Sequence, residues 1–175
     1  MKKGIIGTLA AAALVIGAAG VSNIQTYEGV RTTAYQDPVG IWTICYGHTG
    51  PEVKRGLRLS RTQCDTILMD DIRKHRNGLQ RCLERPLNQN QSDAVVSFAF
   101  NVGVTNTCKS TLVRKINAGD MDGAAREFPK WRYVSTPRGP VALPGLIKRR
   151  EAEQVLFLSR RAPRAPAAVF LETTS

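Results

Sequence analysis

Residues 28–50 read EGVRTTAYQDPVGIWTICYGHTG and contain two short runs of β-branched and aromatic residues. Asp37-Pro38 and Gly40 separate the runs, so the pattern predicts a β-hairpin. The hairpin would place Asp37 and Thr43 on one rim, facing Glu28 just upstream. Two carboxylates that flank a cleft, with a hydroxyl that holds a water, are the groups that a glycosidase needs.

The composition is that of a single basic domain. A length of 175 residues allows one domain with its own hydrophobic core. The formal net charge of +11 and the pI of about 10.0 favour an anionic partner: nucleic acid, a cell wall or a membrane surface. Basicity alone does not distinguish these partners, and the sequence contains no short nucleic-acid-binding motif.

Residues 4–21 form an uncharged segment behind Lys2 and Lys3. Four of its 18 residues are Gly, six are Ala and one is Thr, which leaves seven large aliphatic residues. At ~0.3–0.6 kcal/mol for each of these, membrane insertion gains only about 2–4 kcal/mol. Two interpretations stay open: a weak membrane span, or a signal peptide cut near Ala18 and Gly20.

The chain has four cysteines, and in an exported protein an even number predicts disulfides. Four cysteines allow three connectivities. A metal site with His48 or His75 is disfavoured because no pair of cysteines has C-x-x-C spacing. Buried free thiols are the remaining alternative.

Beyond residue 60 the apolar residues recur with helical periodicity. Ser60 and Gln63 form a capping box that opens a helix over residues 61–84, in which Gly78 is a weak point. Residues 91–102 have almost no polar face, which predicts the central buried helix. Further helices are expected over residues 111–117, from a cap at Asp120 or Asp122 to Trp131, and over residues 146–158, with a loop over residues 133–144.

Residues 28–50 resemble the active-site segment of the phage-type lysozymes, the endolysins of tailed phages. The family pattern is a Glu at the end of a first helix, Asp and Thr on a hairpin, and then Gly-His. The resemblance continues through FAFNVG (98–103), STLVRKINAGD (110–120) and GLIKRREAE (145–153), and covers residues 27–158. The weak N-terminal span resembles that of the signal-anchor-release subgroup, which waits in the inner membrane and then leaves it. This resemblance favours an uncleaved segment.

The resemblance implies an α+β, mostly helical, lysozyme-like fold with two lobes. A small lobe carries the hairpin, a larger lobe is helical, and a long helix joins them around a cleft. The expected domains are a signal-anchor-release segment (residues 1–23), a lysozyme catalytic domain (residues 24–159) and a flexible tail with prolines (residues 160–175).

Carried over residue by residue, the resemblance makes Glu28 the general acid, a carboxyl that gives its proton to the leaving glycosidic oxygen. Asp37 is then the carboxylate that activates water or stabilises positive charge on the sugar, and Thr43 holds that water. A water between carboxylate and sugar implies an inverting reaction. The alternative is that Glu28 and Asp37 are ordinary solvated charges.

Two basic residues are candidates to pair with Glu28. Arg149 lies where the family keeps an arginine beside the catalytic Glu, and Arg150 is its neighbour. The alternative is that both belong to the exposed polar face of a basic helix.

Three more side chains have expected supporting roles. His48 is expected to anchor its loop by hydrogen bonds, because two carboxyls already fill the acid and base roles. Trp42 and Trp131 are expected to pack in the core, with sugar-stacking as the alternative.

We predict disulfides Cys45–Cys64 and Cys82–Cys108. The first would join the strand after Thr43 to the start of the long helix, and the second would join the end of that helix to the segment after the buried one. The N-terminal segment contains no cysteine, so activation by thiol exchange is not expected.

The predicted activity is that of a muramidase, which cleaves the β-1,4 bond between N-acetylmuramic acid and N-acetylglucosamine in peptidoglycan, for host lysis and phage release. The alternatives are a lytic transglycosylase, which needs no Asp–Thr water clamp, and a membrane-tethered wall-binding protein without turnover. We expect no cofactor, no metal ion and no nucleic acid. The protein should be an exported monomer that is tethered at the inner membrane and later periplasmic.

Overall fold

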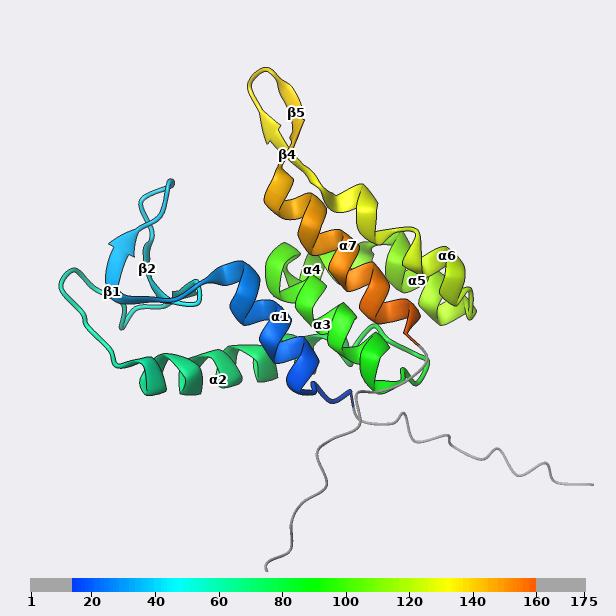
Figure 1. Ribbon diagram of the computed structural model, residues 1–175, viewed down its shortest axis with the longest axis horizontal. Helices are drawn as coiled ribbons and strands as arrows, with labels where there is room; N and C mark the ends of the chain where they lie inside the picture. Colours follow the sequence, from blue (N-terminus) through cyan, green and yellow to red (C-terminus); the bar gives the residue numbers. More distant parts are fainter. Residues whose placement is uncertain (1–13, 160–175) are drawn as a thin grey trace, which may run out of the picture.

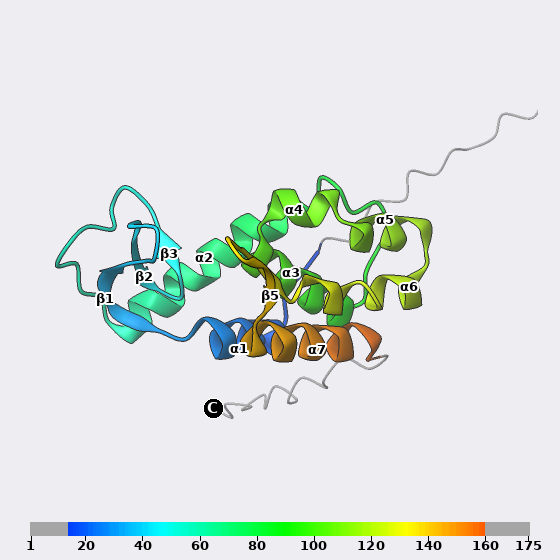
Figure 2. The same cartoon turned by 90° about the horizontal axis from the view of Figure 1, so that it is seen from above.

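The computed structural model describes residues 14–159 and contains a small β lobe and a larger helical lobe (Figure 1). The helix α2 (Arg61–Leu79) contacts both β2 (Trp42–Cys45) and α3 (Gln89–Val102), so it connects the two lobes (Figure 2). This arrangement confirms the predicted α+β, two-lobed, lysozyme-like fold.

The β lobe contains the predicted hairpin. The strand β1 (Arg31–Gln36) pairs antiparallel with β2, with Tyr35 opposite Thr43. A short third strand, β3 (His48–Thr49), pairs with the other edge of β2. Gly40 has a φ of 86° in the turn, a conformation that favours glycine over other residues.

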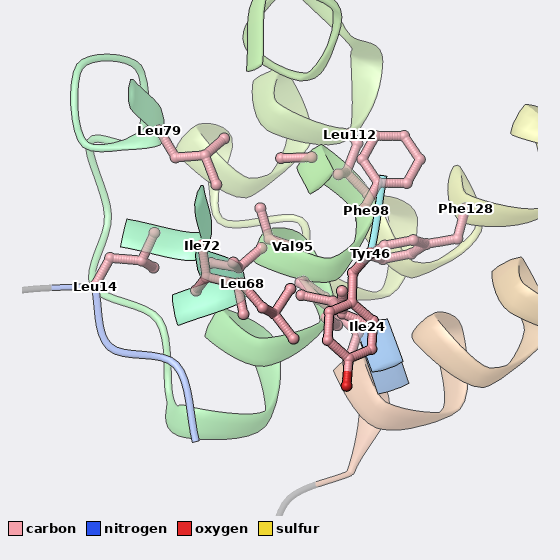
Figure 3. Packing of buried hydrophobic residues seen from close by; sticks show 14 of the residues in the cluster. Leu14, Ile24, Tyr46, Leu68, Ile72, Leu79, Val95, Phe98, Leu112 and Phe128 are labelled. Carbon is pink, nitrogen blue, oxygen red and sulfur yellow. The ribbon is translucent and has the colours of Figure 1, made fainter. Parts of the chain in front are cut away.

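The helix α3 lies at the centre of the helical lobe. Its N-cap Asn88 and Gln91 form a capping box, and the side chains of Val95 and Phe98 are fully buried. It contacts α1, α2, α4 and α7. Figure 3 shows that the core around it gathers side chains from Leu14 to Phe128, and this continuous packing fixes α1 against the helical lobe. The remaining helices are α1 (Ala18–Glu28), α4 (Val104–Lys109), α5 (Thr111–Ala118), α6 (Met121–Ala125), the 3-10 helix η1 (Phe128–Trp131) and α7 (Pro144–Leu158).

The helix α2 ends at Leu79, so the prediction of a helix to residue 84 was wrong. Cys82 keeps the helical spacing but lies in the following turn. The side chain of Asn117, at the end of α5, donates to the carbonyl of Cys82 at 2.8 Å and accepts from the amide of Glu84 at 3.0 Å. These tertiary hydrogen bonds replace the ones that another helical turn would have made.

Residues 133–144 do not form the expected loop. They contain the hairpin of β4 (Tyr133–Thr136) and β5 (Gly139–Ala142), which projects from the helical lobe (Figure 1). The prediction failed because prolines usually interrupt strands. Here Pro140 lies in a two-stranded sheet, where each strand is an edge that tolerates a missing donor.

Two further boundaries differ from the predictions. The segment capped by Asp120 is not one helix to Trp131, because α6 ends at Ala125 and η1 follows as a separate turn. The short helix α4 was not predicted at all.

The N-terminal part of the described chain is folded onto the helical lobe. The helix α1 runs across the expected domain boundary between residues 23 and 24. Residues 1–13 of the expected membrane segment, and the tail from residue 160, lie outside the described residues. Within residues 14–159, no helix has both the length and the apolar character needed to cross a membrane.

Candidate active site

Glu28 is the last residue of α1, and its side chain is 21% exposed at the junction of the two lobes. The helix stops there because Gly29 adopts a φ of 66° while its amide still donates to the carbonyl of Gln25 at 3.1 Å. Gly47, in the turn between β2 and β3, faces the same carboxylate. A Cβ at that glycine would lie 3.7 Å from Oε2 of Glu28, so a larger side chain at this position would contact that oxygen.

Arg149 is the arginine that pairs with Glu28. Its Nη1 donates to Oε1 of Glu28 at 2.7 Å, and the arginine side chain is only 3% exposed. Arg150 instead lies over the ring of Phe98, with its guanidinium carbon 4.8 Å from the ring centre. Both arginines are buried, so the interpretation that they form an exposed basic helix face was wrong.

Asp37 lies directly after β1, and a turn holds its carboxylate in place. Its Oδ1 accepts the backbone amides of Val39 at 3.0 Å and of Ile41 at 2.8 Å. Both bonds use one oxygen, which leaves Oδ2 to face a ligand or a water.

Thr43 lies on β2 and is 4% exposed. Its hydroxyl donates to the carbonyl of Ile41 at 3.1 Å, and its oxygen can still accept a hydrogen bond from a water. Because Ile41 also binds Asp37 through its amide, the two side chains share one backbone segment as their support.

Glu28, Asp37 and Thr43 lie within the part of the chain that matches a known family. The family model for phage lysozymes matches residues 25–153 of the chain. The chain belongs to the phage lysozyme family. It is therefore a glycoside hydrolase of the lysozyme type, as the sequence predicted.

Relatives of this phage lysozyme cover most of its length. An endolysin of Acyrthosiphon pisum secondary endosymbiont phage 1 is 43% identical over 140 residues, which are 80% of the chain and 95% of that relative. A SAR-endolysin of Enterobacteria phage P21 is 31% identical over 161 residues, 90% of the chain and 95% of that relative. These relatives support the predicted signal-anchor-release subgroup.

Solved structures give the same result for the fold. The muramidase domain of SpmX from Asticaccaulis excentricus has a TM-score of 0.79 and 36% identity, and covers 83% of this phage lysozyme and 98% of that chain. An endolysin from the Escherichia coli O157:H7 phage FAHEc1 has a TM-score of 0.79 and 30% identity, with 88% and 99% covered.

His48 of the phage lysozyme lies between two carboxylates. Its Nδ1 is 2.6 Å from Asp71 of α2, and its Nε2 is 2.7 Å from Glu52. Burial acts to lower the pKa of His48, but the hydrogen bonds and charges of Glu52 and Asp71 outweigh it, so the pKa is raised. Both ring nitrogens are occupied, which suits a residue that anchors the loop.

The four cysteines form Cys45–Cys64 and Cys82–Cys108, the same pairs that the sequence predicts. The first bond joins β2 to α2, and the second joins the turn after α2 to α4. Within residues 14–159, no group of three or more His, Cys, Asp or Glu side chains is placed to hold a metal ion.

The two tryptophans pack against the core. Trp131 makes an edge-to-face contact with Phe98, with 5.3 Å between ring centres, and Trp42 packs against the same buried cluster. These contacts support core packing.

Glu153 and Ser97, which contact Arg149, were not predicted from the sequence. Glu153 is fully buried, and its Oε1 is 3.2 Å from Nε of Arg149. The carbonyl of Ser97 accepts from Nη2 of the same arginine at 3.1 Å. The segment RREAE (149–153) could have indicated these contacts, because Glu153 follows Arg149 and Arg150 at the spacings of helical ion pairs.

Proposed function

We propose that this phage lysozyme hydrolyses the β-1,4 bond between N-acetylmuramic acid and N-acetylglucosamine in peptidoglycan, with Glu28 as the general acid. The observation that carries the proposal is the ion pair of 2.7 Å between Arg149 and Glu28. It holds one carboxyl oxygen, Oε1, and leaves the other oxygen, which lies near Gly47, to meet the glycosidic oxygen. The biological outcome of this reaction would be lysis of the host and release of phage.

In the proposed reaction, Glu28 gives its proton to the glycosidic oxygen as the bond from the anomeric carbon to that oxygen breaks. Asp37 takes a proton from a water, and the oxygen of that water attacks the anomeric carbon from the opposite face. Thr43 accepts a hydrogen bond from the same water. The products are a free hydroxyl on one sugar and an inverted reducing end on the other.

Proton NMR of freshly formed product tests this mechanism. A newly formed reducing end with inverted anomeric configuration is expected, whereas retention would make Asp37 a nucleophile. A lytic transglycosylase uses no water and would leave no reducing end. A wall-binding protein without turnover would release no product at all.

We infer that the N-terminal segment first holds the enzyme in the inner membrane and is later released uncleaved. The support comes from the way in which residues 14–21 meet α3. The amides of Gly17 and Gly20 donate to the carboxylate of Asp93 at 2.6 and 3.1 Å, and Asp93 is fully buried. Gln89 of α3 also donates to the carbonyl of Val15 at 3.0 Å.

Membrane insertion and this folded state compete for the same residues. Residues 18–21 belong both to the apolar segment and to the first turn of α1. While they lie in the bilayer, α1 cannot dock on Asp93, and Glu28 cannot be held against Arg149 in the geometry described above. The segment therefore acts as an inhibitor while it is inserted and as a structural helix after release.

Cell fractionation tests the release model. Immunoblots of membrane and soluble fractions through the lysis period should show transfer of full-length protein to the soluble fraction. The N-terminal sequence of the soluble form should begin before residue 4. A soluble form that begins near residue 20 would identify a cleaved signal peptide instead.

A further inference from the structure

Glu153 is a carboxyl group inside the helical lobe that no step of the proposed reaction uses directly. It lies on α7 and is fully buried. Its Oε1 accepts from the hydroxyl of Ser97 at 2.8 Å and from Nη2 of Arg150 at 3.0 Å, and its Oε2 is 2.9 Å from Nε of Arg150. A buried carboxylate with this many partners is costly to remove, and its partners include the arginine beside Glu28.

The guanidinium of Arg149 is held on three sides. Nε faces Glu153 at 3.2 Å, Nη2 donates to the carbonyl of Ser97 at 3.1 Å, and Nη1 donates to Glu28 at 2.7 Å. A planar guanidinium with three fixed hydrogen bonds has one orientation. Glu153 and Ser97 therefore determine where Nη1 points, and so where the carboxyl of Glu28 is held.

The cluster contains two guanidiniums and two carboxyl groups. Burial lowers the pKa of Arg150 to about 10, so this side chain is still protonated at neutral pH. Burial raises the pKa of Glu153, and the guanidiniums of Arg150 and Arg149 oppose that rise. Glu153 thus lies between two positive charges, one of which contacts the carboxyl of Glu28.

We propose that Glu153 is a positioning residue for the general acid: it orients Arg149 and offsets the positive charge of both arginines near Glu28. Without that offset, the two guanidiniums would favour the ionised form of Glu28, which has no proton to give. This inference rests on the role proposed above for Glu28.

The other charged or titratable groups around the cluster come from two elements. Tyr27 and Glu28 face it from α1, and Glu151 lies on α7 with the two arginines. The helix α3 contributes the neutral hydroxyl of Ser97. Glu153→Gln is therefore the change that removes one negative charge from the cluster while it keeps the shape of the side chain.

The test is the pH profile of kcat/KM on a soluble peptidoglycan fragment. Glu153→Gln should move the alkaline limb to lower pH by about 1–2 units, the size expected for one unit charge several ångströms away. At pH 7 kcat should fall about tenfold or more, with KM nearly unchanged. Glu153→Asp keeps the charge, so its alkaline limb should lie at the wild-type pH. Ser97→Ala removes one hydrogen bond and no charge, so its limb should stay in place.

A second variant tests the same proposal and should shift the alkaline limb of the pH profile in the opposite direction. Arg150→Met replaces a buried cation with an apolar side chain of similar length, and it should move the alkaline limb to higher pH. This variant also keeps the proposal testable if Glu153→Gln does not fold. An alkaline limb that stays in place in a folded Glu153→Gln or Arg150→Met protein, with activity reduced equally at every pH, would assign Glu153 a structural role only. If Glu28 were not the general acid, Glu28→Gln would remain active. That result would be distinguishable from a failure of the role proposed for Glu153.

Discussion

Glu28 and Arg149 are 121 residues apart in sequence and form an ion pair of 2.7 Å that joins the end of α1 to α7. The same helix, α1, is anchored at its other end on Asp93 of α3. The carboxyl proposed as the general acid is therefore positioned by a helix whose first turn comes from the apolar N-terminal segment. In the proposed release model, this one helix links catalysis and membrane release.

We expect Glu28→Gln to reduce lysis of purified cell walls by at least ~100-fold, because the amide has nearly the same shape but cannot donate the proton. The variant should still unfold cooperatively, since its amide oxygen can accept the hydrogen bond from Arg149. Turbidity clearing measures the activity, and circular dichroism measures the fold. Glu84→Gln, at an exposed carboxylate, is the matched control. Clearing by Glu28→Gln at the wild-type rate would show that another residue is the acid.

The pair of His48 and Asp71 should make stability depend on pH. The pKa of His48 is raised in the folded protein, so the stabilisation is complete below the unfolded value of about 6.5 and is lost as pH rises through the folded value. We expect Asp71→Asn to lower the unfolding free energy by about 1–3 kcal/mol near pH 6 and by clearly less at pH 9.

Asp70→Asn is the matched control for this prediction. Asp70 is the preceding residue on α2, but it is exposed and pairs with Arg73. Its replacement should cost at most about 1 kcal/mol. Denaturant unfolding at both pH values provides the measurement. An equal loss at pH 6 and pH 9 for Asp71→Asn would contradict a stabilising charged His48.

Gly78 shows why a helix propensity rule fails in a tertiary structure. In an isolated helix, Gly→Ala gains up to ~1 kcal/mol. Here a Cβ on Gly78 would lie 2.7 Å from Cγ1 of Val104, because α2 and α4 approach closely at this point. Gly78→Ala should therefore destabilise the protein by about 1–3 kcal/mol. In a double-mutant cycle, Val104→Ala should remove most of that cost. A gain in melting temperature for Gly78→Ala alone would contradict the close approach.

The sequence predicted the features that depend on local patterns. The hairpin follows from its turn residues, the start of α2 from the capping box at Ser60, and the burial of α3 from its apolar faces. It could not separate Arg149 from Arg150, because adjacent helical residues point about 100° apart and only the packed orientation of α7 decides which one reaches Glu28. That orientation depends on contacts across the lobe, including the hydrogen bond of Tyr27 to the carbonyl of Lys148 at 3.0 Å.

Other features depend on partners that are distant in sequence. Asp93 is an unremarkable polar residue in a helix until the amides of Gly17 and Gly20, more than 70 positions earlier, bind to it. The same reason explains the early end of α2, where Asn117 supplies the replacement hydrogen bonds. A pattern read along the chain contains no signal for such pairs.

The final prediction distinguishes two possible controls of release: the hydrophobicity of the N-terminal segment in the bilayer and the docking of α1 on Asp93. Gly7 lies in the apolar segment outside the described residues, so Gly7→Leu tests hydrophobicity: it should strengthen insertion by ~0.5 kcal/mol or more and delay release. Gly20→Leu adds a second effect, because a Cβ there would lie 2.9 Å from Cβ of Asp93 and would block docking of α1. Gly20→Leu should therefore stay longer in the membrane fraction than Gly7→Leu, and its soluble form should have low specific activity.

Asp93→Ala tests docking alone, because it leaves the hydrophobicity of the segment unchanged and removes the acceptor for the amides of Gly17 and Gly20. If docking helps to draw the segment out of the bilayer, Asp93→Ala should shift protein toward the membrane fraction and delay lysis. Asp122→Ala, at an exposed position, should behave as wild type.

Collapse of the membrane potential should speed release of Gly7→Leu, and the released protein should have the wild-type specific activity. Wild-type timing for Asp93→Ala would show that the bilayer alone controls release, and soluble protein cleaved near residue 20 would show that the segment is a signal peptide.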